Sequence, residues 1–233
     1  MILPRGGSDA ALSDADLPHI PGGYIQETLH LDHRDLFYLR PSEPDGILAI
    51  PEIVERFDRE GDAPYWTHVW PPGGDMARVV HRSDWPIETR VLELGCGVGL
   101  VSMGAAARGW DVAASDNQPE AVRLAAINAA RNGLLVEEFL LDWRHPLTRQ
   151  FDRILGCDVT YDDALQTPLL DVVTKMLAPE GEAWFADFGR MHAPLFMRRA
   201  RDAGFHVTLV DEHDRPLQEF QTAHYQLLKL KHV

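Results

Sequence analysis

From Arg90 to the end of the sequence, short apolar segments alternate with longer segments of helical periodicity. The apolar segments, each typical of a buried strand, are RVLEL (90–94), DVAAS (111–115), LVEEFL (135–140), FDRILGC (151–157), EAWFAD (182–187) and FHVTLV (205–210). Helices are predicted at 98–108, 119–132, 163–177 and 193–203. The last segment, AHYQLLKLK (223–231), alternates polar and apolar residues, as an antiparallel strand does. This order predicts an α/β class fold, a doubly wound, Rossmann-like sheet of seven strands that is mostly parallel with an antiparallel last strand.

The part of the chain before this repeat is predicted to be an N-terminal extension. Residues 1–23, rich in Gly, Pro, Asp and Ser, show no periodicity and are expected to form a flexible arm. Residues 24–70 are expected to cover the binding site with a hairpin and a helix. Their predicted elements are strands YIQETLHL (24–31) and LFYLRP (36–41), the turn DHRD between them, and a helix in AIPEIVERFDREG (49–61). Residues 71–233, beginning with a helix near Gly73, then form the ligand-binding domain.

Composition narrows the possible partners and the compartment. The 36 acidic and 22 basic side chains give a formal charge of −14, which argues against nucleic acid or an anionic membrane as the main partner. A basic protein surface or a cationic small molecule fits this sign better, although an acidic surface also serves solubility alone. Cys96 and Cys157 have no paired spacing and are expected to be reduced thiols. With no signal peptide and no apolar run of about 20 residues, the protein is expected to be cytoplasmic.

The segment VLELGCGVGLV (91–101) places three glycines where a strand turns into a helix. Such a turn lets the main chain approach a ligand closely. Gly95, Gly97 and Gly99 give the spacing GxGxG, whereas the dinucleotide motif GxGxxG needs a glycine where Leu100 stands. A phosphate-binding loop would need a lysine after the last glycine, and none is present. A glycine-rich turn used only for close packing is the alternative interpretation.

Polar side chains also follow the next two predicted strands. Asp116 stands after the second strand, where an acid can accept hydrogen bonds from both hydroxyls of a ribose. Asp142, in LDWR, can accept a hydrogen bond from an adenine amino group, and Trp143 offers a flat apolar face to a purine. Ordinary core packing is the alternative for Trp143, and an acid at a strand end is common by chance.

Together, YWTHVWPPGGDMA, VLELGCGVGLVSMGAA, ASDNQPEAVRLAAINAARNG, LDWR, LGCDVTYDD and FADFGR resemble one branch of the class I, seven-β-strand S-adenosylmethionine-dependent methyltransferases. It is the branch of small protein-lysine methyltransferases that includes the electron-transfer-flavoprotein β-subunit lysine methyltransferase and bacterial nicotinamide N-methyltransferase-like relatives. The motifs span about residues 60 to 190. In this superfamily an acid stands two residues before the first glycine, as Glu93 does here. A carboxylate there favours the ammonium and the sulfonium of S-adenosylmethionine.

The resemblance implies further site residues. A tryptophan ahead of the glycine loop lines the methionine end of the cofactor, which carries over to Trp70, with Trp66 nearby. The Asp-x-x-Tyr signature carries over to Asp158 and Tyr161 as catalytic residues. The full predicted cofactor-binding set is Trp70, Glu93, Gly95, Gly97, Gly99, Asp116, Asn117, Asp142, Trp143 and Cys157. The family's fifth strand often ends Asp-Pro-Gly-Arg, and this chain has Phe188 in place of the proline.

The predicted activity is methylation of a lysine amine in a protein substrate, with Asp158 orienting the amine and Tyr161 packing its channel or hydrogen-bonding its nitrogen. Methylation of a small amine metabolite is the first alternative, and a non-catalytic cofactor-binding or interaction module is the second. A dehydrogenase is disfavoured by the glycine spacing. The scattered histidines include no HxxxH with an acid partner, so no catalytic metal is expected. The oligomeric state stays open, with a monomer favoured.

Overall fold

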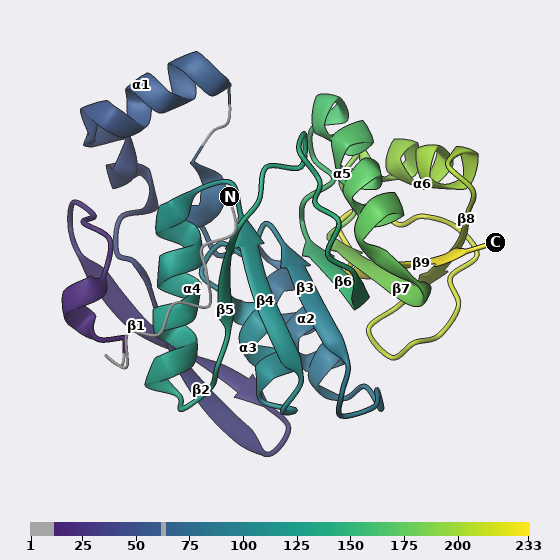
Figure 1. Ribbon diagram of the computed structural model, residues 1–233, viewed down its shortest axis with the longest axis horizontal. Coiled ribbons are helices and arrows are strands. Elements are labelled where there is room, and N and C mark those ends of the chain that lie inside the picture. Colours follow the sequence, from purple (N-terminus) through teal and green to yellow (C-terminus); the bar gives the residue numbers. More distant parts are fainter. Residues whose placement is uncertain (1–11, 62–63) are drawn as a thin grey trace.

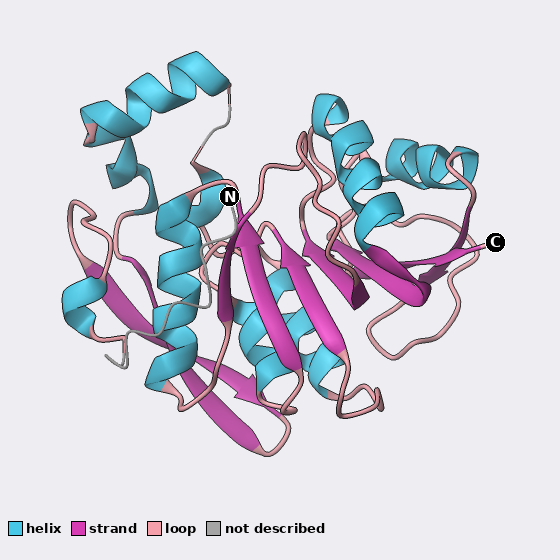
Figure 2. Ribbon diagram, viewed as in Figure 1, coloured by secondary structure: helices cyan, strands magenta, loops and turns pink. Residues whose placement is uncertain are grey.

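The computed structural model describes residues 12–61 and 64–233, and it contains the predicted sheet (Figures 1 and 2). The strand order is β5-β4-β3-β6-β7-β9-β8. The strands are β3 (Arg90–Leu94), β4 (Asp111–Asp116), β5 (Glu137–Leu140), β6 (Phe151–Cys157), β7 (Leu177–Asp187), β8 (Phe205–Val210) and β9 (Gln226–His232). Neighbours from β5 to β7 are parallel, and β9 runs antiparallel to both β7 and β8. The predicted fold class is confirmed.

Helices cover both faces of the sheet, and the core is divided accordingly. Figure 1 shows α5 and α6 in front of the sheet and α2 and α3 behind it. The helices are α2 (Pro72–His81), α3 (Leu100–Ala106), α4 (Pro119–Arg131), α5 (Asp163–Met176) and α6 (Ala193–Asp202). In β3, Val91 joins the apolar cluster on the side of α2 and α3, and Leu92 joins the one beneath α5 and α6. Burial on both faces explains why the strands read as continuous apolar runs.

One strand boundary differs from its prediction. We expected helix to 177 and a strand from 182, but α5 ends at Met176 and β7 begins at once with Leu177. Leu177 pairs with Phe151, and the register then shifts before Glu182 pairs with Arg153. The intervening proline and glycine suggested a turn, and the structure accommodates them in this irregular start of the strand.

The N-terminal extension packs mainly behind the sheet. β1 (Tyr24–Leu31) and β2 (Arg34–Pro41) form a separate antiparallel pair. Only Asp32 and His33 form the turn, which is shorter than the predicted DHRD because pairing starts at Arg34. Hydrogen bonds fix the hairpin to α4, among them Leu39 N–H to Asn128 Oδ1 (2.8 Å) and Asn128 Nδ2 to the Leu39 carbonyl (2.9 Å). After it come the 3-10 helix η2 (Pro44–Ala49) and α1 (Pro51–Glu60).

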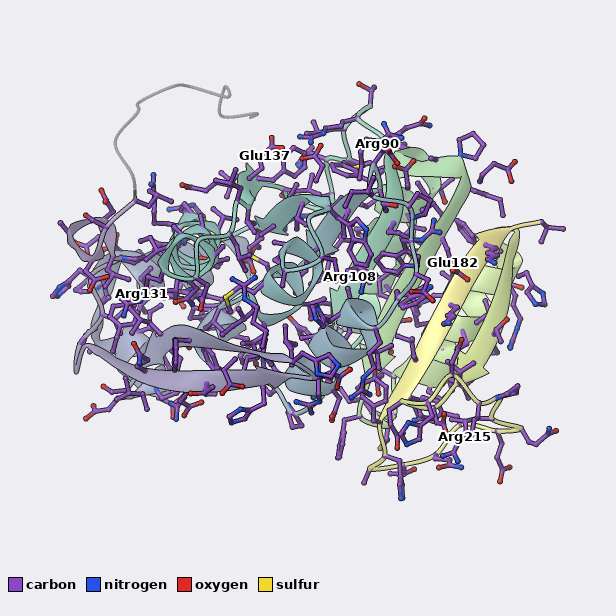
Figure 3. All side chains as sticks on the ribbon, turned by 90° about the horizontal axis from the view of Figure 1, so that it is seen from below. Arg90, Arg108, Arg131, Glu137, Glu182 and Arg215 are labelled. Carbon is purple, nitrogen blue, oxygen red and sulfur yellow. The ribbon has the colours of Figure 1, made fainter. Side chains whose placement is uncertain are left out.

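The described part of the predicted arm contacts α4. It contains the 3-10 helix η1 (Asp14–Asp16), and Ile20 is buried. Arg131, labelled with other surface side chains in Figure 3, pairs with Asp14. Residues 1–11 of that arm lie outside the described residues. Within the described ranges, no helix has both the length and the apolar character needed to cross a membrane.

Candidate active site

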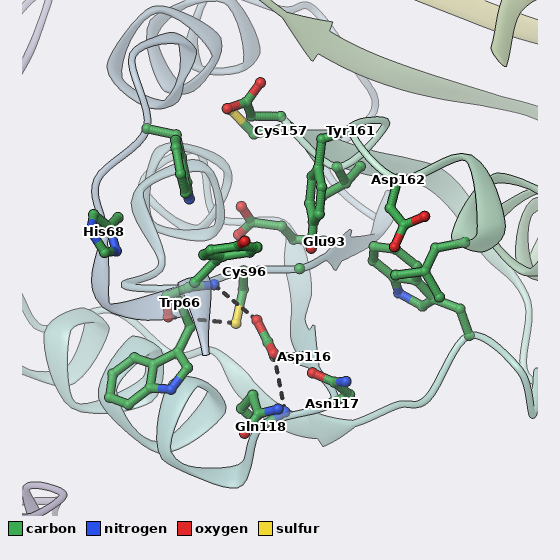
Figure 4. Close-up of a pocket in the computed structure, with 18 of the residues that line it drawn as sticks. Trp66, His68, Glu93, Cys96, Asp116, Asn117, Gln118, Cys157, Tyr161 and Asp162 are labelled. Atoms are coloured by element: carbon green, nitrogen blue, oxygen red, sulfur yellow. Dashed lines mark hydrogen bonds between the residues drawn. The ribbon is translucent and has the colours of Figure 1, made fainter. Parts of the chain in front are cut away.

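The carboxyl ends of β3, β4, β5 and β6 open into one cavity of about 620 Å³ (Figure 4). This volume is within the range of small-molecule sites, and its position is where doubly wound sheets bind ligands. Every residue of the predicted site except Gly99 lines it. These are Trp70, Glu93, Gly95, Gly97, Asp116, Asn117, Asp142, Trp143, Cys157, Asp158 and Tyr161. From the predicted covering extension, residues between Phe57 and Trp70 line the cavity, and the hairpin does not.

The glycine loop has the conformation that its sequence requires. Gly95, Gly97 and Gly99 all have positive φ, at 66°, 51° and 86°. A Cβ on Gly99 would lie 2.7 Å from the Cβ of Ala125, so this glycine brings α3 close to α4. Gly99 therefore serves packing at the start of α3 and does not line the cavity, whereas Gly95 and Gly97 expose main chain to it.

Glu93 is buried in front of this loop, with 2% of its surface exposed. Its Oε2 accepts hydrogen bonds from the Ser102 N–H (2.8 Å) and from the Ser102 hydroxyl. Burial raises the pKa of Glu93 to about 8, since no cation among the described residues compensates the desolvated charge. A cation bound in the cavity would favour the charged form, which matches the role predicted for this residue.

Asp116 links the loops that follow β3 and β4. Its carboxylate accepts hydrogen bonds from the Gly97 N–H (3.3 Å) and the Gln118 N–H (3.1 Å). Burial raises the pKa of Asp116 to about 6. The Asn117 N–H also donates to Asp116, and a carboxylate has about four acceptor positions, so one remains for a ligand hydroxyl such as that of a ribose.

Two buried polar atoms in the cavity wall have no hydrogen-bond partner within the described residues. They are the indole Nε1 of Trp66 and the amide Oε1 of Gln118. Buried polar groups in native proteins are nearly always paired, and these two atoms are exceptions that lie beneath the cavity surface. Gln118 was missed at the sequence level, where nothing distinguishes it from any polar residue in a loop.

At the predicted adenine end, part of the hydrogen-bonding capacity of the side chains is already used within the protein. Asp142 accepts hydrogen bonds from the Arg144 N–H and Nε, both at 2.9 Å. Partial burial raises the pKa of Asp142, but the bonds from Arg144 outweigh it and hold the pKa below its usual value. Trp143 lies beside Gly95, where a Cβ would come within 3.6 Å of its ring. Asp142 thus keeps its charge, and Trp143 closes the cavity next to the glycine loop.

The opposite end of the cavity has aromatic walls around a carboxylate. Tyr65 contacts Trp70 and Tyr161 edge to face, with centroid separations of 5.9 and 5.7 Å. Asp158 has a left-handed backbone (φ 58°), which is uncommon for a non-glycine residue and concentrates at functional sites. Its side chain is 1% exposed and forms an ion pair with Arg190. Sequence reasoning missed Tyr65 and Arg190 as site residues; the arginine of FADFGR was the available signal.

The cavity offers little support for metal or thiol chemistry. No group of three or more histidine, cysteine, aspartate or glutamate side chains among residues 12–61 and 64–233 is placed to hold a metal ion. Cys96 and Cys157 are free thiols, and burial raises the pKa of each. Both cysteines are therefore protonated at neutral pH, which makes them poor nucleophiles.

Comparison with known proteins identifies the family. A family model described as lysine methyltransferase matches residues 75–199, more than half of the chain. The chain belongs to this lysine methyltransferase family. Membership confirms the predicted enzyme class, a methyltransferase, and its cofactor, S-adenosylmethionine. The matched segment contains the glycine loop, the strand-end acids and Arg190.

Two relatives that are named as lysine methyltransferases match part of the chain at low identity. EEF1A lysine methyltransferase 3 of Mus musculus is 30% identical over 128 residues, covering 52% of this chain and 55% of the relative. Protein-lysine N-methyltransferase rrg1 of Schizosaccharomyces pombe is 28% identical over 142 residues, covering 54% and 44%. The chain thus spans about half the length of these curated relatives. A TehB-like SAM-dependent methyltransferase from Corynebacterium glutamicum shares the fold, with a TM-score of 0.60 at 16% identity, covering 82% of this chain and all of that one.

Proposed function

We propose that this protein transfers a methyl group from S-adenosylmethionine to the side-chain amine of a lysine in a protein substrate. The observation that carries the proposal is the aromatic end of the cavity, where Tyr65, Trp70 and Tyr161 adjoin the buried carboxylate of Asp158. Aromatic faces pack against the alkyl stem of a lysine side chain, and the carboxylate can accept a hydrogen bond from its amine. The family description and the two lysine methyltransferase relatives support the same acceptor.

The rest of the cavity fits the cofactor. Glu93 has no cationic partner among the described residues, and Asp116 keeps an acceptor position for a ligand hydroxyl. We infer that Glu93 holds the cofactor's positive end and that Asp116 holds its ribose. Trp70 and Trp143 provide apolar parts of the cavity wall. S-adenosylmethionine supplies a methyl group already activated on a positively charged sulfur.

The residues at the acceptor end then have to present an amine with a free lone pair. Holding a lysine neutral near pH 7.4 costs about 4 kcal/mol, from about three pKa units at ~1.36 kcal/mol each. Burial against Tyr65, Trp70 and Tyr161 lowers this cost because desolvation disfavours the charged form. Asp158 and Tyr161 orient the amine, and positioning of this kind supplies much of the catalysis.

A small amine metabolite is the second candidate acceptor. Phe57, Gly61 and the residues from Tyr65 to Trp70 that line the cavity form part of its wall. This enclosure favours a small acceptor more than an open groove would.

The test is transfer of labelled methyl from S-adenosylmethionine in a lysate, with Asp158→Ala as the inactive control. We expect label in protein, and mono-, di- or trimethyl-lysine after hydrolysis. Label confined to the small-molecule fraction would establish the metabolite alternative. Cofactor binding without transfer to either fraction would indicate the non-catalytic module.

A further inference from the structure

Arg190 is held rigidly at the end of β7. The residue before it, Gly189, has φ 81°, and a Cβ there would lie 2.4 Å from the Ala223 nitrogen. The Arg190 N–H donates to Asp187 Oδ1 at 2.7 Å, and Asp187 Oδ2 accepts from the Thr160 hydroxyl at 2.8 Å. These contacts join the loop after β7 to the loop after β6. The backbone of Arg190 is thereby fixed beside the acceptor end of the cavity.

The guanidinium of Arg190 contacts three residues of the cavity wall. Its Nε lies 2.7 Å from Asp158 Oδ1 and its Nη2 lies 2.5 Å from Oδ2, a bidentate ion pair. Its carbon is 5.1 Å from the centroid of Trp70 and 6.0 Å from that of Tyr161. A cation of the chain itself thus already lies against the carboxylate and the aromatic faces at which a lysine would arrive.

This arrangement matters for the protonation of the acceptor. An unpaired carboxylate within about 4–6 Å of an amine raises the pKa of the amine by about 1–3 units. The ammonium form has no lone pair and is unreactive toward a methyl donor. A buried Asp158 without Arg190 would therefore bind lysine in its unproductive form, and the ion pair cancels that charge.

We propose that Arg190 is a positioning residue that neutralises Asp158, so that the acceptor end of the cavity receives a lysine amine in its neutral form. The inference rests on the proposed function. Arg190 already supplies the positive charge beside Asp158. The site therefore favours an arriving amine in its neutral form over the ammonium form. The position, bond geometry and stacking of the guanidinium all follow from the two loops that hold it.

The other charged groups around this end have contacts of their own. Asp187 is turned toward Thr160 and the Arg190 backbone, and Asp163 pairs with His192 at 2.8 Å. The remaining titratable side chains that line the cavity near it or act on its charges are Tyr65, His68, Glu93, Cys157, Tyr161, Asp162 and Asp75. None of them changes in the variants below, so a difference between variants reports the pair Asp158 and Arg190.

The test uses n-butylamine, which reproduces the end of a lysine side chain, titrated into protein saturated with S-adenosylhomocysteine. Binding is followed by saturation-transfer NMR between pH 8 and pH 10, below the amine's reference pKa of about 10.4. For the wild type we expect the apparent affinity to rise nearly tenfold per pH unit, because only the neutral amine binds. For Arg190→Met we expect tighter binding at pH 8 and little dependence on pH, because the ammonium pairs with Asp158.

Two further variants isolate the charge. Asp158→Asn combined with Arg190→Met removes both charges and should restore the wild-type pH dependence, and Arg190→Lys should retain it. The double variant also keeps the test decisive if Arg190→Met alone does not fold. Equal pH dependence in the wild type and Arg190→Met, or a double variant that binds like Arg190→Met, would overturn the inference and leave the proposed function standing. Absence of butylamine binding in all four proteins would overturn the inference and the lysine acceptor together.

Discussion

The proton on Glu93 provides a quantitative test of how the cavity binds its cofactor. Burial raises the pKa of Glu93 to about 8, so about 0.9 of a proton occupies this carboxylate at pH 7. A cation placed beside it lowers the pKa, and the proton leaves. Asp116, with a pKa of about 6, holds only about 0.1 of a proton at pH 7. Binding of S-adenosylmethionine is therefore expected to release about one proton, nearly all of it from Glu93.

The direction of the proton exchange determines how the affinity for S-adenosylmethionine depends on pH. Because binding releases a proton, affinity rises with pH, by nearly tenfold between pH 6 and pH 7. The range from pH 6 to pH 7.5 is suitable, since an α-amino group titrates near 7.7–8.0 and the cofactor's own ammonium stays mostly charged below that. Titration calorimetry in phosphate and in Tris, which differ in ionisation enthalpy, gives the number of protons released directly.

Glu93→Gln is the matched control, because its amide oxygen can still accept from Ser102 but carries no titrating proton. We expect it to release about 0.1 of a proton at pH 7 and to show a shallower rise of affinity with pH. Release of about one proton by the variant would refute the assignment of that proton to Glu93. A wild-type affinity that falls with rising pH would refute the expected sign.

Two further predictions concern the free energy of unfolding. Gly99→Ala should lower the free energy of unfolding by more than 2 kcal/mol in urea titrations, because the new Cβ would meet Ala125. Gly133→Ala is the control, since Gly133 also has a positive φ (68°) but no atom within 4 Å of an added Cβ, and it should cost only about 1 kcal/mol. Equal losses in the two variants would contradict the packing argument. Glu93 keeps its proton to a higher pH in the folded protein, where its pKa is about 8, than in the unfolded chain. The free energy of unfolding therefore falls as the pH rises from about 4.5 to 8. Glu93→Gln should remove up to ~5 kcal/mol of that fall, and an unchanged dependence of stability on pH would contradict this assignment.

The sheet could be predicted because its strands and helices have different apolar periods. RVLEL and FDRILGC begin and end as predicted, since burial on both faces leaves an apolar run bounded by charged or polar residues. β7 was predicted too short because Pro179 and Gly181 resemble a turn, and only pairing with β6 reveals strand there. The glycine spacing and the strand-end acids were sufficient to predict most of the cavity lining.

What the sequence could not predict depends on contacts between distant loops. Arg190 and Asp158 are 32 residues apart, and their ion pair exists because two adjacent strands end at the same edge of the sheet. Gln118 and Tyr65 acquire significance only from burial and from the rings around them. The left-handed backbone of Asp158 likewise has no local signature in Cys-Asp-Val-Thr.

The most direct test of the central claim is calorimetric titration with S-adenosylmethionine and, separately, with NAD, on the wild type and on Asp116→Ala. We expect saturable binding of S-adenosylmethionine alone, lost or strongly weakened in the variant, because Asp116 holds the glycine loop and offers an acceptor position to the ribose. Binding of NAD, or binding of S-adenosylmethionine that is unchanged in Asp116→Ala, would contradict the account of this cavity.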